Sequence, residues 1–321
     1  MRFEFWVWLI LLVLALIAPV GKKPVSVAEP PSQPSKPPPS VSIPELPPSF
    51  SISEAYLVVV VIDGLRPDAL QRARTPHIDR LWQSGLYSWT AQTVMPSTTL
   101  PAIASLLSGV PPERHGIEWN YWAPERGRIA VPTIFTIAQA EKISTVAFVS
   151  KRKLEHLFGP ETPLFVINND ARHVITAATG YMAEHRPRLV FVHLSDVDEV
   201  GHRHGWMTLQ QLQAIERVDE ALGLLLASLE ELQMLDNSVI IVTSDHGGHG
   251  RIHGTDDPRD MTIPWILWTP KIETGRELTQ SIRIYDTAAT ALAALGLAIP
   301  EDWLGVPVLE AFPEATLSEK P

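Results

Sequence analysis

Short apolar runs alternate with amphipathic stretches from Ser53 onward. Apolar side chains occupy nearly every position of these runs, which is typical of strands buried on both faces of a parallel sheet. The pattern therefore predicts a central sheet that helices cover on each side. The predicted strands are Tyr56 to Ile62, Ser144 to Val149, Leu189 to Leu194, Ser238 to Thr243 and Ile263 to Trp268.

Two of the stretches between and after these runs have the spacing of helices. Apolar residues recur at intervals of three and four between Thr208 and Leu232, and a second amphipathic stretch from Tyr285 ends in Gly296. The alternation predicts an α/β fold with a doubly wound, mostly parallel central sheet flanked by helices. Residues 53–321 leave little room for a second domain, so we predict one domain there.

The N-terminus carries an uninterrupted apolar run, Phe5 to Val20, with basic residues on both sides. Sixteen residues are fewer than the ~20 of a spanning helix and fit a secretory signal. An uncleaved anchor is the alternative, because no A-x-A cleavage motif follows and positive charge flanks both ends. We expect residues 1–22 to be a signal peptide or N-terminal membrane anchor, and the protein to be exported to the periplasm or the extracellular space.

Residues 23–52 are rich in proline. Proline lacks an amide donor and favours extended backbone, so this segment predicts a disordered tether between the N-terminal run and the folded domain. A processed propeptide is the alternative interpretation.

Composition excludes several classes of site. Lys and Arg number 26 against 36 Asp and Glu, and the longest basic run is Lys151 to Lys153, so a surface for duplex nucleic acid is not expected. The chain has no cysteine, which excludes disulfides, thiolate metal sites and a cysteine nucleophile. Any metal ligands are therefore histidines and carboxylates.

Acidic residues and histidines follow three of the predicted strands directly. Because the carboxyl ends of parallel strands meet at one edge of a sheet, these side chains are expected to converge there, although they are far apart in the sequence. Clustered His and Asp residues favour a metal site over isolated structural roles. The candidates are Asp63, Asp198, His202, Asp245, His246, His249 and His253.

A cluster of hydroxyl residues, Ser97 to Thr99, precedes a predicted helix that has Pro101 in its first turn. A hydroxyl at a helix N-terminus lies where negative charge is favoured, which suits a nucleophile or a bound phosphoryl group. Simple helix capping is the alternative explanation of the cluster.

Six ordered motifs resemble the alkaline phosphatase superfamily, most closely its nucleotide pyrophosphatase/phosphodiesterase branch (type I phosphodiesterases). They are VVVVIDG, PSTTLPAIASLLSG, HGIEWN, DVDEVGH, SDHGGHG and IHGTDD, between Tyr56 and Pro270. The resemblance implies an alkaline phosphatase-like catalytic domain over residues 53–321 and two zinc ions, with manganese as the alternative metal. The mixed His and Asp ligands suit either metal.

The resemblance also implies a role for individual residues. Thr99 resembles the nucleophile and would also bind the second metal, with Thr98 as the alternative; Asn120 resembles the residue that donates to a nonbridging phosphoryl oxygen. His249 has no counterpart. The implied ligands are Asp198, His202 and His253 for one zinc, and Asp63, Asp245 and His246 for the other.

The expected substrate is a small phosphoryl compound, with nucleotides among the candidates. Two groups of residues, one aromatic and one basic, indicate which kind of phosphoryl compound it is. Trp119, Tyr121 and Trp122 flank Asn120, where they would stack on an aromatic group or belong to the core. These neighbours and the overall motif similarity favour phosphodiester or pyrophosphate cleavage through a phosphothreonine intermediate.

Two lysines favour a different substrate. Lys151 and Lys153 resemble the lysine pair of phosphonoacetate hydrolases and would bind a dianion, which favours a phosphomonoesterase or phosphonate hydrolase. A non-catalytic, tethered metal-binding ectodomain is the third hypothesis. A sulfatase is disfavoured, because that branch places Arg four residues after a Cys or Ser, whereas Ile103 follows Thr99 here.

Overall fold

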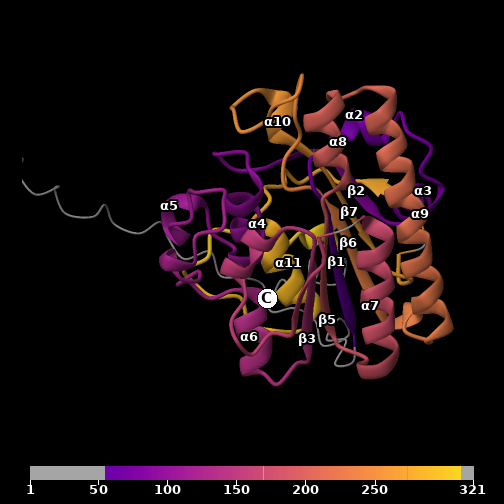
Figure 1. Ribbon diagram of the computed structural model, residues 1–321. Coiled ribbons are helices and arrows are strands. Elements are labelled where there is room, and N and C mark those ends of the chain that lie inside the picture. Colours follow the sequence, from indigo (N-terminus) through magenta and orange to yellow (C-terminus); the bar gives the residue numbers. More distant parts are fainter. Residues whose placement is uncertain (1–54, 169, 273, 312–321) are drawn as a thin grey trace, which may run out of the picture. The chain divides into compact units, whose positions relative to one another are not determined.

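The computed structural model describes residues 55–168, 170–272 and 274–311 (Figure 1). Its centre is an eight-stranded sheet with the order β4-β3-β5-β1-β6-β7-β2-β8. The strands are β1 (Tyr56–Ile62), β2 (Leu86–Gln92), β3 (Thr145–Val149), β4 (Leu164–Val166), β5 (Leu189–Leu194), β6 (Ser238–Thr243), β7 (Thr262–Trp268) and β8 (Arg276–Glu277).

Helices cover both faces of this sheet, and residues of β1 alternate between the two cores. Leu57, Val59 and Val61 pack in a core with α4 (Thr99–Ser108), α6 (Ile134–Ala140) and α11 (Asp286–Ala294). Val58, Val60 and Ile62 face α3 (Pro76–Gln83), α7 (Ala171–His185) and α9 (Leu209–Glu231). Figure 1 shows these two helix layers on opposite sides of the strands, which confirms the predicted α/β class. The remaining helices are α2 (Pro67–Leu70), α5 (Pro112–His115), α8 (Asp196–His204) and α10 (Pro258–Met261).

The direction of one strand differs from the expectation. The five strands from β4 to β6 are parallel, but β7 runs antiparallel to both β6 and β2. Almost all residues of β7 are buried, like those of the parallel strands. An apolar sequence therefore indicates that a strand is buried, but it does not indicate the direction of the strand. Strands β2, β4 and β8 were not among the predicted strands.

The site depends on the register of three neighbouring strands. Ile62 of β1 pairs with Leu194 of β5, and Val61 pairs with Thr243 of β6. These residues are the last or next-to-last of their strands, so the chain leaves all three strands at the same edge of the sheet.

No helix in the described ranges is both long and apolar enough to cross a membrane. The predicted signal or anchor at residues 1–22 and the tether at residues 23–52 lie outside the described residues.

Candidate metal centre and nucleophile

The loops after β1, β5 and β6 bring together the acidic residues that the sequence singles out. Asp63 directly follows β1, Asp198 lies in the first turn of α8, and Asp245 follows β6. Gly64 makes this close approach feasible, since a Cβ atom there would lie 3.0 Å from the Cα of Asp198. Its φ of +75° also favours glycine, and its amide donates to Asp245 Oδ1 at 3.1 Å.

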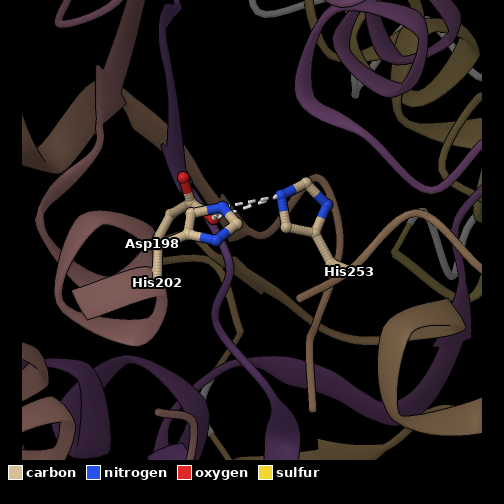
Figure 2. Close-up of side chains that lie close together, drawn as sticks. All are labelled: Asp198, His202 and His253. Atoms are coloured by element: carbon tan, nitrogen blue, oxygen red, sulfur yellow. Dashed lines mark hydrogen bonds and ion pairs between the residues drawn. The ribbon is translucent and has the colours of Figure 1, made fainter. Parts of the chain in front are cut away.

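Asp198, His202 and His253 form the first candidate group, shown in Figure 2. The two Nε2 atoms lie 3.1 Å apart, and they lie 3.3 Å (His202) and 3.5 Å (His253) from Asp198 Oδ1. Four ligands around a tetrahedral zinc lie about 3.3 to 3.5 Å from one another, given bond lengths of about 2.0 to 2.1 Å. The two distances to Asp198 Oδ1 lie in this range, and the distance between the two Nε2 atoms is slightly shorter, so a small shift of the rings would let the group hold a metal ion of this size.

Backbone carbonyls fix the orientation of both rings. His202 Nδ1 donates to Arg251 O and His253 Nδ1 donates to Ser97 O, each at 3.0 Å. The protonated nitrogen of each ring therefore points away from the group, and Nε2 carries the lone pair that a metal needs.

Asp63, Asp245 and His246 form the second predicted group, and all three are fully buried. His246 Nε2 lies 3.3 Å from Asp63 Oδ1 and 3.4 Å from Asp245 Oδ2. Asp63 also belongs to two further groups with ligand atoms within 4.8 Å of one another, one with His193 and Asp245 and one with Asp198 and His246. The two predicted metal groups therefore adjoin through Asp63.

Four atoms in these groups are buried and lack a hydrogen-bond partner among the described residues. Burial of an unpaired polar atom is unfavourable by about 1 to 3 kcal/mol, so four together need an explanation. A bound metal would satisfy all of them, which is the strongest sign that these side chains fit metal ions. The atoms are Asp63 Oδ1, Asp198 Oδ1, Asp245 Oδ2 and His246 Nε2.

Lys151 bridges the two groups. Its Nζ lies 2.6 Å from Asp63 Oδ2 and 2.6 Å from Asp198 Oδ2. Burial works against the charged lysine, but the two carboxylates raise its pKa above the ordinary value. Burial likewise opposes ionisation of Asp63, while Lys151 and His193 hold the pKa of Asp63 well below its usual range. Burial and Asp63 oppose ionisation of Asp198, but the hydrogen bond from His202 and the charge of Lys151 lower its pKa to about 2. Both carboxylates are therefore ionised at neutral pH, as metal ligands must be.

His246 and His253 differ in charge. Burial would lower the pKa of His246, but the carboxylates of Asp245 and Asp63 raise it to about 9. Burial and the neighbouring His246 lower the pKa of His253 to about 4. His253 is therefore neutral at pH 7. His246 is protonated at this pH, and it would lose the proton on binding a metal ion beside the carboxylates.

Two hydroxyls among the described residues hydrogen-bond to a carboxylate of these groups: Ser244 Oγ donates to Asp245 Oδ1 at 3.5 Å, and Thr99 donates to Asp63 from the start of a helix. Thr99 is the fully buried first residue of α4, and its Oγ1 donates to Asp63 Oδ2 at 3.4 Å. Thr98 is the N-cap of α4, yet its side chain makes no capping hydrogen bond. The helix N-terminus favours negative charge at Thr99 Oγ1.

Asn120 lies next to the start of α4. Its Oδ1 accepts hydrogen bonds from Leu100 N at 3.0 Å and from Lys153 Nζ at 2.7 Å. Since two donors occupy the oxygen, the amide NH2 group of Asn120 is left to donate to a ligand. Burial and the nearby Lys151 lower the pKa of Lys153 to about 8.

The aromatic residues around Asn120 are not equally accessible. Trp119 packs against the core, and the Arg126 guanidinium lies 4.7 Å from its ring centre. Arg152 covers Trp122 in the same way at 4.8 Å. Tyr121 is 54% exposed, so it is the residue of this cluster with most surface left for a ligand.

Sequence reasoning missed His193, and it assigned His249 to the loop or to the support of the ligands because this residue has no counterpart in the family. His193 lies inside the apolar strand β5 and hydrogen-bonds to Asp63 Oδ2 at 3.0 Å. The one available signal was a histidine inside a run of apolar residues. His249 contacts the buried Asp260 at 2.7 Å and so supports the loop that carries His253.

A family model described as type I phosphodiesterase / nucleotide pyrophosphatase matches residues 57–251. The chain belongs to this family. The match confirms the resemblance that the six motifs indicated. A sulfatase family model matches the shorter range 206–297.

Relatives of this phosphodiesterase family member are distant in sequence. Bis(5'-adenosyl)-triphosphatase ENPP4 of Bos taurus is 25% identical over 225 residues, which cover 62% of this chain and 49% of that protein. The chain spans about half or less of the length of the curated relatives it matches.

Solved structures show the same fold. Murine ectonucleotide pyrophosphatase / phosphodiesterase 5, an inactive variant in complex with AMP, has a TM-score of 0.66 at 16% identity and covers 77% of this chain and 96% of its own. A 2-O GAG sulfatase has a TM-score of 0.68 at 13% identity, covering 84% of this chain and 76% of its own. At these identities the likeness concerns the fold.

Proposed function

We propose that this phosphodiesterase family member is an exported hydrolase that uses two zinc ions and Thr99 to cleave phosphodiester or pyrophosphate bonds. One observation carries the proposal: the buried Thr99 hydroxyl lies 3.4 Å from Asp63, inside a cluster with four unpartnered metal-ligand atoms. Family membership supports the reaction class, and the AMP complex of one structural relative supports a nucleotide-sized substrate.

The proposed reaction has two displacement steps. Thr99 Oγ forms a bond to phosphorus while the bond to the leaving oxygen breaks, and the Thr99 proton passes to solvent. Water then attacks the phosphothreonine, the bond from phosphorus to Thr99 Oγ breaks, and the hydroxyl is restored. When bound, the two metal ions would act as Lewis acids that lower the pKa of the nucleophile and offset charge on the leaving oxygen.

The protein's own residues orient these steps. The hydrogen bond to Asp63 Oδ2 directs Thr99, and the N-terminus of α4 stabilises negative charge on its oxygen. The amide NH2 group of Asn120 donates to a nonbridging oxygen, because Leu100 N and Lys153 hold its carbonyl oxygen.

Export is part of the proposal. Its support is the apolar run Phe5 to Val20 and the proline-rich segment that follows. Mass spectrometry of the N-terminus of the protein from its native host distinguishes a cleaved signal from a retained anchor. An intact N-terminus on protein in the cytosolic fraction would contradict export.

A comparison of three substrates tests the reaction class. Zinc-loaded protein is assayed with a nitrophenyl phosphodiester, the corresponding monoester and phosphonoacetate at equal concentration. We expect the diester to have the highest kcat/KM, since the donor that we assign to a nonbridging oxygen, the Asn120 amide, is neutral and does not favour a dianion. Higher kcat/KM for the monoester or for phosphonoacetate would favour the alternative function.

That alternative, a phosphomonoesterase or phosphonate hydrolase, is favoured by Lys151 and Lys153, whose ammonium groups both lie at the site. Converting both to Ala is expected to reduce monoester or phosphonate turnover far more than diester turnover, because a dianion gains more from nearby cations. Arg152→Ala is the matched control, since this neighbouring side chain is largely exposed and pairs with Glu155. Equal losses with all substrates would show that the lysines do not recognise a dianion.

The non-catalytic ectodomain is the remaining hypothesis. Its motivation is the predicted tether and the stretch of aromatic residues around Asn120. Metal-dependent turnover of any of the three compounds by the wild type, lost on Thr99→Ala, would reject it.

A further inference from the structure

We propose that His193 is a positioning residue for Asp63: it donates its Nε2 hydrogen to Asp63 Oδ2 and thereby leaves Oδ1 to bind the metal. The proposal rests on the proposed function, because it concerns a metal at the same site. It assigns a role to a histidine that neither the six motifs nor the predicted ligand sets include.

Three neighbouring strands place the residues in a row. His193 of β5 pairs with Val61 of β1 on one side and with Val149 of β3 on the other. Asp63 and Ser150 follow shortly after these two partners in the sequence. His193 is fully buried between them, and its environment on β5 is otherwise apolar.

The two ring nitrogens have different partners. Nδ1 lies 2.9 Å from Ser150 Oγ, and Nε2 lies 3.0 Å from Asp63 Oδ2. An ionised carboxylate only accepts hydrogen bonds, so Nε2 must carry the hydrogen. The contact between Ser150 Oγ and Nδ1 holds the other side of the ring, so the two contacts together fix the ring plane.

The consequence for Asp63 follows from its two oxygens. Oδ2 accepts from His193, contacts the Lys151 ammonium at 2.6 Å and accepts from Thr99. Oδ1 is buried with no hydrogen-bond partner among the described residues, and it lies 3.3 Å from His246 Nε2. His193 therefore contacts the oxygen that does not face His246, and it holds the carboxylate so that Oδ1 faces His246 and would be available to a metal ion.

Direct coordination by His193 is the competing arrangement, since Asp63, His193 and Asp245 have ligand atoms within 4.8 Å. In that arrangement Nε2 would turn its lone pair to a metal and could not donate to Asp63. The two arrangements predict different results for a side chain that donates a hydrogen bond to Asp63 but lacks the imidazole nitrogen. Such a side chain should preserve metal binding if His193 acts as a donor, and it should weaken metal binding if His193 is a ligand.

The test compares His193→Gln with His193→Leu in the full-length chain. The Gln amide is able to place an N–H near the position of Nε2, whereas Leu fills the space without a donor. We measure zinc dissociation constants by competition with a chelating dye, and the visible absorption of the cobalt-substituted protein, which reports the ligand set.

We expect His193→Leu to weaken zinc binding at one site by about 10- to 100-fold, the usual effect of losing a hydrogen bond to a ligand. His193→Gln is expected to restore most of that affinity and to leave the cobalt spectrum unchanged. Wild-type affinity in His193→Leu, or equal loss in both variants together with a changed cobalt spectrum, would overturn the proposal.

Ser150→Ala keeps the proposal testable if His193→Leu does not fold. Loss of the hydroxyl frees Nδ1 and is expected to weaken zinc binding by less than the loss of the ring, roughly threefold to tenfold. Unchanged affinity in this folded variant would overturn the proposal. These measurements need no substrate, so they remain decisive even if the wild type hydrolyses none of the phosphoryl compounds.

Discussion

Thr99→Ala is expected to abolish turnover of phosphodiesters, with a fall in kcat of about three to six orders of magnitude. The Thr99 hydroxyl is the group that bonds to phosphorus in the proposed reaction. Among the described hydroxyls at the start of α4, it alone hydrogen-bonds to Asp63, Asp198 or Asp245. Steady-state kinetics with a nitrophenyl diester measure the loss. Zinc content is measured in parallel.

Two variants serve as controls for Thr99→Ala. Thr99→Ser keeps a hydroxyl at the same place and is expected to retain measurable turnover. Thr98→Ala removes the neighbouring hydroxyl, which has no hydrogen-bond partner among the described residues, and is expected to keep most of the activity. Loss of turnover in Thr98→Ala with undiminished turnover in Thr99→Ala would assign the nucleophile to Thr98.

Asp198→Asn is expected to give the second largest effect. The change removes the charge from one corner of the triangle formed with His202 and His253, and it removes one of the two carboxylates that hold Lys151. We expect bound zinc to fall from two ions to one per chain. Diesterase activity should fall by roughly 10²- to 10⁴-fold, because one Lewis acid is worth several kcal/mol.

Asp256→Asn is the matched control for Asp198→Asn. Asp256 is an exposed acid three residues after His253, so its loss changes the net charge equally without touching the group. Atomic emission of dialysed protein counts the zinc in each variant. Two tightly bound ions in Asp198→Asn would contradict its assignment as a ligand.

The ends of β1 and β6 were predictable from the sequence, because a run of buried apolar residues is followed closely by an acidic residue. Six apolar residues of β1 precede Asp63, and Asp245 follows β6 in the same way. Strands of this kind lie side by side in a parallel sheet, so the convergence of their ends follows from the pattern alone. The direction of β7 does not follow from it, because its pattern is the same for either direction.

The finer contacts of the site were not predictable, since they depend on tertiary packing. The K-x-K spacing suggested that Lys151 and Lys153 act together on a substrate, yet a 3-10 helix, Arg152–Leu157, begins between them. Their ammonium groups therefore reach different partners: Lys151 contacts Asp63 and Asp198, and Lys153 contacts Asn120.

Trp119 illustrates the same limit. Its place beside Asn120 left two interpretations open, stacking on an aromatic group or packing in the core, and the sequence could not show that Arg126, seven residues later, covers its ring. His193 was overlooked because an isolated histidine in an apolar strand is usually structural. Only the register of β1, β3 and β5 reveals its contact with Asp63.

The central claim is that two cations lie beside the Thr99 hydroxyl. Anomalous X-ray diffraction at the zinc absorption edge, from crystals of the zinc-loaded protein, tests it most directly. We predict two peaks about 4 Å apart, one bound by Asp198, His202 and His253 and the other by Asp63, Asp245 and His246, with Thr99 Oγ next to the second. A single peak, or peaks remote from Thr99, would contradict the claim.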